Sequence, residues 1–186
     1  MFIFGARKKG KIMNQNFNDY TRLKSDKNYI NVAFNEKNGG LMATHIEHSF
    51  DKNKGYYEKD VQEIGYNNGY AVILEKEDHT KFKIKQTDGK WNGKPFEIGA
   101  AETGTKNNIR NGLKHCAGKP NTDIAILYFP NKNFNVHNFE KGLSKYNGLI
   151  STSQFKKFAE IICISDGKIM YKKSHYKSGR SEEPTI

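Results

Sequence analysis

The chain has 186 residues, of which 35% are hydrophobic. This length suits one domain that can bury a substantial core. Lysine and arginine outnumber aspartate and glutamate by 31 to 20, and the resulting net charge of +11 favours a polyanionic partner such as nucleic acid. No hydrophobic run approaches the roughly 20 residues of a membrane span. We therefore expect a cytoplasmic protein with no membrane partner.

The two ends of the chain are expected to carry little order. Residues 1–28 are basic and rich in asparagine, with isolated aromatic residues, and residues 172–186 have a similar character. The predicted domain therefore spans residues 29–171.

Between these ends, the hydrophobic pattern predicts alternating helices and strands. In the helix expected at 55–67, for example, Tyr57, Val61 and Ile64 fall on one face. The hydrophobic residues of 41–51 show no clear helical or strand periodicity, and we expect a short helix or loop there. In chain order, the other expected elements are strands at 29–34, 70–74, 82–88 and 94–100, a helix at 106–117, a strand at 124–129, a helix through 136–146, and strands at 161–164 and 168–171. Helices between strands predict an α/β fold, in which a mixed sheet has helices on its faces.

A hairpin is predicted within TDGKWNGKPFEIG, residues 87–99. Asn92-Gly93 is typical of a two-residue type I′ turn. With these residues as the loop, Asp88 lies directly opposite Glu97, with Cβ atoms about 4.5–5.5 Å apart. Like charges in this position are destabilising. Exposure to water would relieve them, and so would a divalent cation, since Mg²⁺ is held by one or two carboxylates plus waters and phosphate oxygens.

Asp88, the Asn92-Gly93 turn and Phe96-Glu97-Ile98 resemble the PD-(D/E)XK nuclease superfamily, in particular the tRNase toxin domains at the C-terminus of contact-dependent-inhibition proteins. The resemblance covers roughly residues 56–129 and includes the element order α-β-β-β-α-β of the family's restriction-endonuclease-like core. It implies a metal-dependent endonuclease that acts on RNA, such as tRNA, in preference to DNA. It also implies an immunity protein as a partner and delivery into a target cell.

The resemblance further implies roles for individual carboxylates. Asp88 and Glu97 match the residues that hold the family's divalent metal, with Mg²⁺ expected first and Mn²⁺ or Zn²⁺ as alternatives. A glutamate on the first helix often assists, and Glu58 or Glu63 is placed for this role. Glu58 is the expected catalytic residue, although a solvated position on the helix surface would explain it too.

The family's catalytic lysine has no counterpart at the expected position, two residues after Glu97, where this chain has Gly99. That lysine orients or helps to deprotonate the attacking water. Either the domain binds nucleic acid without catalysis, or another basic residue has taken over, or the resemblance is misleading. Lys90 shares the strand face of Asp88, and the next helix offers Lys106 and Arg110 as replacements.

Contacts with nucleic acid are expected around the hairpin and on the next helix. Trp91, flanked by basic residues, can stack on an unpaired base, or it can pack against its own strand. Lys94 and Lys114 add positive charge for phosphate contacts.

A histidine pair offers a different chemistry. His45 and His48 are three residues apart and would share one face of a helix. Such a pair suits a metal-independent RNase that uses histidines as base and acid. Simple exposure of both histidines is the alternative.

Overall fold

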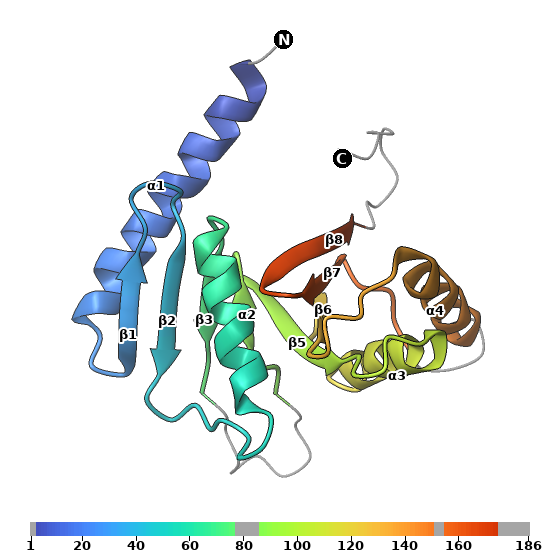
Figure 1. Cartoon of the computed structure of the whole chain (residues 1–186). Helices are drawn as coiled ribbons and strands as arrows, with labels where there is room; N and C mark the ends of the chain where they lie inside the picture. Colours follow the sequence, from blue (N-terminus) through green and yellow to red (C-terminus); the bar gives the residue numbers. More distant parts are fainter. Residues whose placement is uncertain (1–2, 77–85, 151–154, 175–186) are drawn as a thin grey trace.

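An eight-stranded mixed β-sheet forms the centre of the fold, and its strands lie side by side in chain order from β1 to β8 (Figure 1). The computed structural model describes residues 3–76, 86–150 and 155–174. Its elements are α1 (Ile3–Ser25), β1 (Tyr29–Phe34), β2 (Leu41–His45), α2 (Gly55–Asn67), β3 (Ala71–Leu74), β4 (Gly89–Trp91), β5 (Lys94–Ala100), α3 (Lys106–Ala117), β6 (Ile124–Phe129), α4 (Val136–Ile150), β7 (Glu160–Ser165) and β8 (Lys168–Ser174). Within the described ranges, no helix is long and apolar enough to cross a membrane.

The sheet combines antiparallel hairpins with parallel crossovers. Strands β1–β2, β3–β4, β4–β5 and β7–β8 pair antiparallel. Strands β2–β3, β5–β6 and β6–β7 pair parallel, and the chain passes through α2, α3 and α4 between them. This is the mixed α/β fold that the sequence predicts. From α2 to β6 the elements follow the expected order α-β-β-β-α-β.

The helices cover both faces of the sheet. α2 packs on the face that carries Val72 and Ile126. α3 and α4 pack on the opposite face, which carries Ala125 and Leu127. α1 covers the β1–β3 end of that opposite face, where Ala71 belongs to its hydrophobic cluster. The strand residues of both clusters alternate because successive strand side chains point to opposite faces.

Helix α1 lies where we expected little order. The prediction for residues 1–28 is wrong because Asn16, Tyr20 and Leu23 fall on one helical face and pack on the sheet. Leu23 is 1% exposed, and the Asn16 amide donates a 2.8 Å hydrogen bond to the Gly39 carbonyl. Tertiary packing supplies most of the stability of such a helix, so its narrow apolar stripe gives only a weak sequence signal.

Three further predictions differ from the structure. Residues 41–45 form strand β2 rather than a helix or loop, because Leu41 and Ala43 are buried under α1 between two neighbouring strands. A strand that is covered on both sides loses the alternating pattern that would reveal it. At the C-terminal end, β8 continues to Ser174, beyond the predicted boundary at residue 171. Residues 82–85 of the strand expected at 82–88 lie outside the described residues, and 86–88 are not part of a strand.

Candidate active site

The hairpin between β4 and β5 has the predicted geometry. Asn92 and Gly93 take φ angles of 48° and 77°, as a type I′ turn requires. The paired residues are Gly89 with Phe96, Lys90 with Pro95, and Trp91 with Lys94. This register places Asp88, which directly precedes β4, across from Glu97.

Four carboxylates line one cavity of about 370 Å³. One is Asp51, which precedes α2, and the other three come from different elements. Glu58 comes from α2, Asp88 from the start of the hairpin, and Glu97 from β5. Lys54 and His115 also line this cavity. We call it the carboxylate cavity. It lies where α2 and α3 approach the hairpin from opposite faces of the sheet.

Glu97 is almost completely buried, with a side-chain exposure of 2%. Its Oε1 atom lies 3.1 Å from Nε2 of His115 and 3.3 Å from Nζ of Lys119. Its Oε2 atom is buried and has no hydrogen-bond partner among the described residues. Buried polar atoms without a partner are rare in folded proteins and call for an explanation such as a bound ion or water.

Asp88 is held against the same strand by a hydrogen bond. Its Oδ2 atom accepts from the backbone N–H of Ile98 at 2.8 Å. Burial, and then the negative charge of Glu97, raise the pKa of Asp88 well above its usual range, and Glu58 acts in the same direction. Burial and the neighbouring carboxylates therefore disfavour the ionised form of Asp88, and a positive partner would stabilise that form.

Glycine at position 99 follows from the close approach of α3. A Cβ atom on Gly99 would lie 2.5 Å from the carbonyl oxygen of Gly112. A lysine therefore cannot stand there unless the helix moves. Lys119, which follows α3, brings an ammonium group to Glu97 instead, and it also donates to the carbonyl oxygen of Gln86.

Lys119 and His115 were missed as site residues by sequence reasoning. Lys119 stands between Gly118 and Pro120, which signal only the end of a helix. His115 looks like a surface residue of α3, and its side chain is indeed 61% exposed. The one sequence feature that indicates a role for them is their position at the C-terminal end of the helix that follows Glu97 in the chain.

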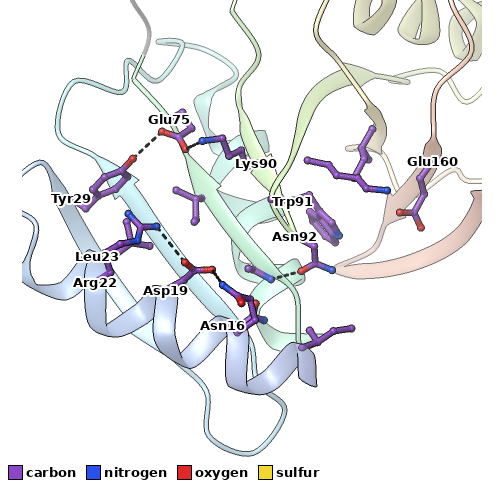
Figure 2. Close-up of a pocket in the computed structure, with 17 residues that line it drawn as sticks. Asn16, Asp19, Arg22, Leu23, Tyr29, Glu75, Lys90, Trp91, Asn92 and Glu160 are labelled. Carbon is purple, nitrogen blue, oxygen red and sulfur yellow. Dashed lines mark hydrogen bonds and ion pairs between the residues drawn. The ribbon is translucent and has the colours of Figure 1, made fainter. Parts of the chain in front are cut away.

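The three basic residues expected to replace the lysine lie elsewhere. Lys90 forms a 2.9 Å ion pair with Glu75, as Figure 2 shows, and lines a larger cavity of about 750 Å³ between α1 and the hairpin. Arg110 donates to Asn111. Neither these two residues nor Lys106 belongs to the described lining of the carboxylate cavity.

The larger cavity has a rim of mixed charge. Figure 2 shows that Glu75 contacts both Tyr29 and Lys90, and that Arg22 pairs with Asp19. Positive and negative groups on this rim neutralise one another. Among the described residues, this rim therefore offers no net positive surface of the kind that nucleic acid prefers.

Of the three residues predicted to contact nucleic acid, the structure rules out Trp91 and leaves Lys94 and Lys114 as predictions. Trp91 is 1% exposed and packs with Tyr70 and Phe96, at ring-centroid distances of 4.9 Å and 6.4 Å. The expectation that it stacks on a base is therefore wrong, and the alternative of packing within the sheet holds. Lys94 is exposed on the hairpin, and Nζ of Lys114 lies 5.4 Å from the centroid of the Phe155 ring. Their phosphate contacts stay predictions.

The two histidines do not share a helical face, because β2 ends at His45 and a turn follows. The His45 ring packs against Tyr29 at a centroid distance of 5.2 Å. His48 is buried, and its Nε2 atom lies 2.8 Å from Oε2 of Glu58. Glu63 is exposed on α2 and lines a different hollow, so Glu58 is the glutamate of α2 that belongs to the carboxylate cavity.

Comparisons with known proteins give one structural likeness. No family model matches the chain, and no curated protein matches it. A chain in the CdiA-CT/CdiI toxin and immunity complex from Burkholderia pseudomallei has a similar fold, with a TM-score of 0.50 and 18% sequence identity. The match covers 66% of this chain and 86% of that chain. At this identity the likeness shows a shared fold, of the kind found in that complex.

Proposed function

We propose that this chain is a metal-dependent nuclease of the toxin type that hydrolyses phosphodiester bonds in RNA. The observation that carries the proposal is Glu97, a buried carboxylate that faces Asp88 in the carboxylate cavity and has one oxygen without a hydrogen-bond partner among the described residues. Two adjacent carboxylates are the donor set that Mg²⁺ and Mn²⁺ prefer, with waters and substrate phosphate completing the shell. The described residues include no cluster of three or more His, Cys, Asp or Glu with metal-site geometry, so the proposed site depends on these two carboxylates.

Asp88 and Glu97 would hold the cation. When bound, a divalent cation lowers the pKa of a water molecule and offsets charge on the phosphate. The Ile98 N–H fixes Asp88, and Lys119 and His115 fix Glu97, which limits how far either carboxylate can turn. Lys119 would also replace the lysine that is missing at Gly99, by orienting the attacking water and stabilising the negative charge that develops.

RNA is proposed as the substrate because of the resemblance to tRNase toxin domains. The net charge of +11 supports a nucleic-acid partner, with Lys94 and Lys114 as candidate phosphate contacts. The shared fold with a chain of a toxin and immunity complex supports an immunity protein as a further partner, and it fits delivery into a target cell.

Cleavage assays with matched variants test this proposal. The purified chain is incubated with tRNA, single-stranded DNA or duplex DNA in Mg²⁺, in Mn²⁺ or in EDTA. We expect cleavage of RNA that needs the metal and is lost in Asp88→Asn and Glu97→Gln, which keep the side-chain shape. Glu63→Gln, an exposed site on α2, is the control and should cleave normally.

Three results would contradict the proposal. Undiminished cleavage in both carboxylate variants would remove the proposed site. Cleavage that survives EDTA would favour a metal-independent RNase. Salt-sensitive binding of RNA without cleavage in either metal would favour a binding domain. Titration of the metal-free chain with Mn²⁺ gives a separate readout, since Asp88→Asn and Glu97→Gln should weaken binding and Glu63→Gln should not.

A further inference from the structure

His48 is buried beside the carboxylate cavity, with an oxygen atom facing each of its ring nitrogens. Its Nδ1 atom lies 2.8 Å from the carbonyl oxygen of Glu75, and its Nε2 atom lies 2.8 Å from Oε2 of Glu58. The Phe50 ring packs edge-on against the imidazole at 4.7 Å. The side chain of His48 is 0% exposed, so these contacts fix the orientation of its ring.

These contacts determine how many protons the pair holds. A carbonyl oxygen can only accept a hydrogen bond, so Nδ1 must carry a hydrogen. In a neutral imidazole Nε2 then has none, and an ionised carboxylate has none either. Two acceptors at 2.8 Å would repel each other. A proton must therefore lie between Nε2 of His48 and Oε2 of Glu58, which is one more than a neutral histidine and an ionised glutamate would hold.

The pair opens toward the site proposed for catalysis. The Glu58 side chain is 13% exposed and lines the carboxylate cavity together with Asp88 and Glu97. The other titratable groups lining the described cavity are Asp51, Lys54, Tyr57, Asp88, Glu97 and His115. With the shared proton, the His48–Glu58 pair is electrically neutral, so Glu58 adds no full negative charge to Asp88 and Glu97.

We propose that His48 and Glu58 form a proton-sharing pair that protonates the departing oxygen during phosphodiester hydrolysis. This inference rests on the proposed nuclease function. A bond forms between the water oxygen and phosphorus, the ester bond from phosphorus to the departing oxygen breaks, and that oxygen takes the proton from Glu58. The proton lost by the attacking water passes to solvent, and the pair regains a proton from solvent. Glu58 is the catalytic residue, and His48 positions it and shares its proton.

Nuclear magnetic resonance tests the shared proton without metal or substrate. In protein labelled at histidine nitrogen and glutamate carbon, the His48 and Glu58 signals are assigned with His48→Asn and Glu58→Gln. Near pH 7 we expect either a protonated Nε2 or a protonated Glu58 carboxyl. An unprotonated Nε2 beside an ionised Glu58 would overturn the inference. This measurement does not depend on nuclease activity.

Two substrates that differ in their leaving group test the catalytic role. RNA releases an alkoxide that needs a proton, whereas bis(4-nitrophenyl) phosphate releases a stable phenolate that does not. Glu58→Gln and His48→Asn should lower the rate on RNA by about 10²–10⁴-fold, the usual contribution of a general acid, and should change the rate on the nitrophenyl ester much less. Affinity for Mn²⁺ should stay unchanged, which shows that the variants are folded.

Equal losses on both substrates would reduce the pair to a structural role and refute the proposal. Glu63→Gln serves again as the control on α2. An unmodified chain that cleaves neither substrate would refute the nuclease function and the catalytic role together, and the resonance experiment would still decide whether the proton is shared.

Discussion

The contact between Gly99 and Gly112 predicts a measurable cost for adding one methyl group. In Gly99→Ala, the new Cβ would lie 2.5 Å from the carbonyl oxygen of Gly112, roughly 1 Å closer than the optimum separation of nonbonded atoms. That oxygen belongs to the backbone of α3 and cannot rotate away. We expect the free energy of unfolding to fall by about 1–3 kcal/mol, as in other overpacked cores.

Urea denaturation monitored by fluorescence measures this cost, because Trp91 is the sole tryptophan and is buried. Gly112→Ala should lower the free energy of unfolding less than Gly99→Ala does. Its Cβ would meet the flexible end of the Leu127 side chain at 2.8 Å, and that side chain can move. Gly148→Ala on α4 is the control, because no described atom outside the backbone of α4 lies within 4 Å of its new Cβ. It should gain about 0.5–1 kcal/mol from helix propensity. If Gly99→Ala were as stable as the unmodified protein, the close packing of α3 on β5 would be refuted. A lysine at position 99 should therefore destabilise the fold and displace His115 and Lys119.

Three other predictions concern stability and turnover. In EDTA, protonated Asp88 stabilises the fold at low pH. This stabilisation is lost as the pH rises from the ordinary pKa of an aspartate, 3.8, through the raised pKa of Asp88 in the folded state. In denaturation series from pH 4 upward, the unmodified chain should therefore lose stability relative to Asp88→Asn, and parallel curves would contradict this. Lys119→Met should lower turnover by about 10²–10³-fold, as loss of one stabilising donor does. Lys37→Met, at an exposed lysine between β1 and β2, is its control, and equal rates for the two variants would exclude this role. Leu23→Ala should lower the free energy of unfolding in urea by about 2–5 kcal/mol, because α1 buries this side chain on the sheet. A change near zero would show that the packing of α1 does not contribute to the stability of the fold.

Most of the fold could be predicted because several segments carry an unambiguous local pattern. The bounds of β1, α2, β5 and β6 coincide with the predicted ranges. Asn92-Gly93 determines the hairpin register because few residues tolerate two successive positive φ angles. From that register, the opposition of Asp88 and Glu97 follows directly.

The elements that were missed depend on contacts far along the chain. α1 is stable because Leu23 and Tyr20 meet β1 and β2, and β2 is a strand because both of its neighbours pair with it. Neither α1 nor β2 has a strong pattern of its own. A single sequence does not reveal which distant segment covers a weak stripe or a short apolar run.

The same limit applies to the site. Strand parity places Lys90 on the face of Asp88, yet its stem leads the ammonium group to Glu75 in the neighbouring cavity. Lys119 reaches Glu97 from another element, and His48 reaches Glu58 across a turn that the sequence does not specify. Long side chains and tertiary approach decide these contacts, so only the two hairpin carboxylates could be anticipated with their geometry.

The order of strands across the sheet has a consequence for how the protein is assembled. Each strand is bonded to the one that precedes it in the chain, so a new strand always meets a partner that is already in place. Short turns join β1–β2, β4–β5 and β7–β8, and single helical crossovers join the parallel pairs, so the closure entropy of each of these pairings stays low and pairing is rapid. A sheet of this kind can form progressively as the chain is synthesised. Each new strand can pair as soon as it is available, without waiting for a distant segment of the chain.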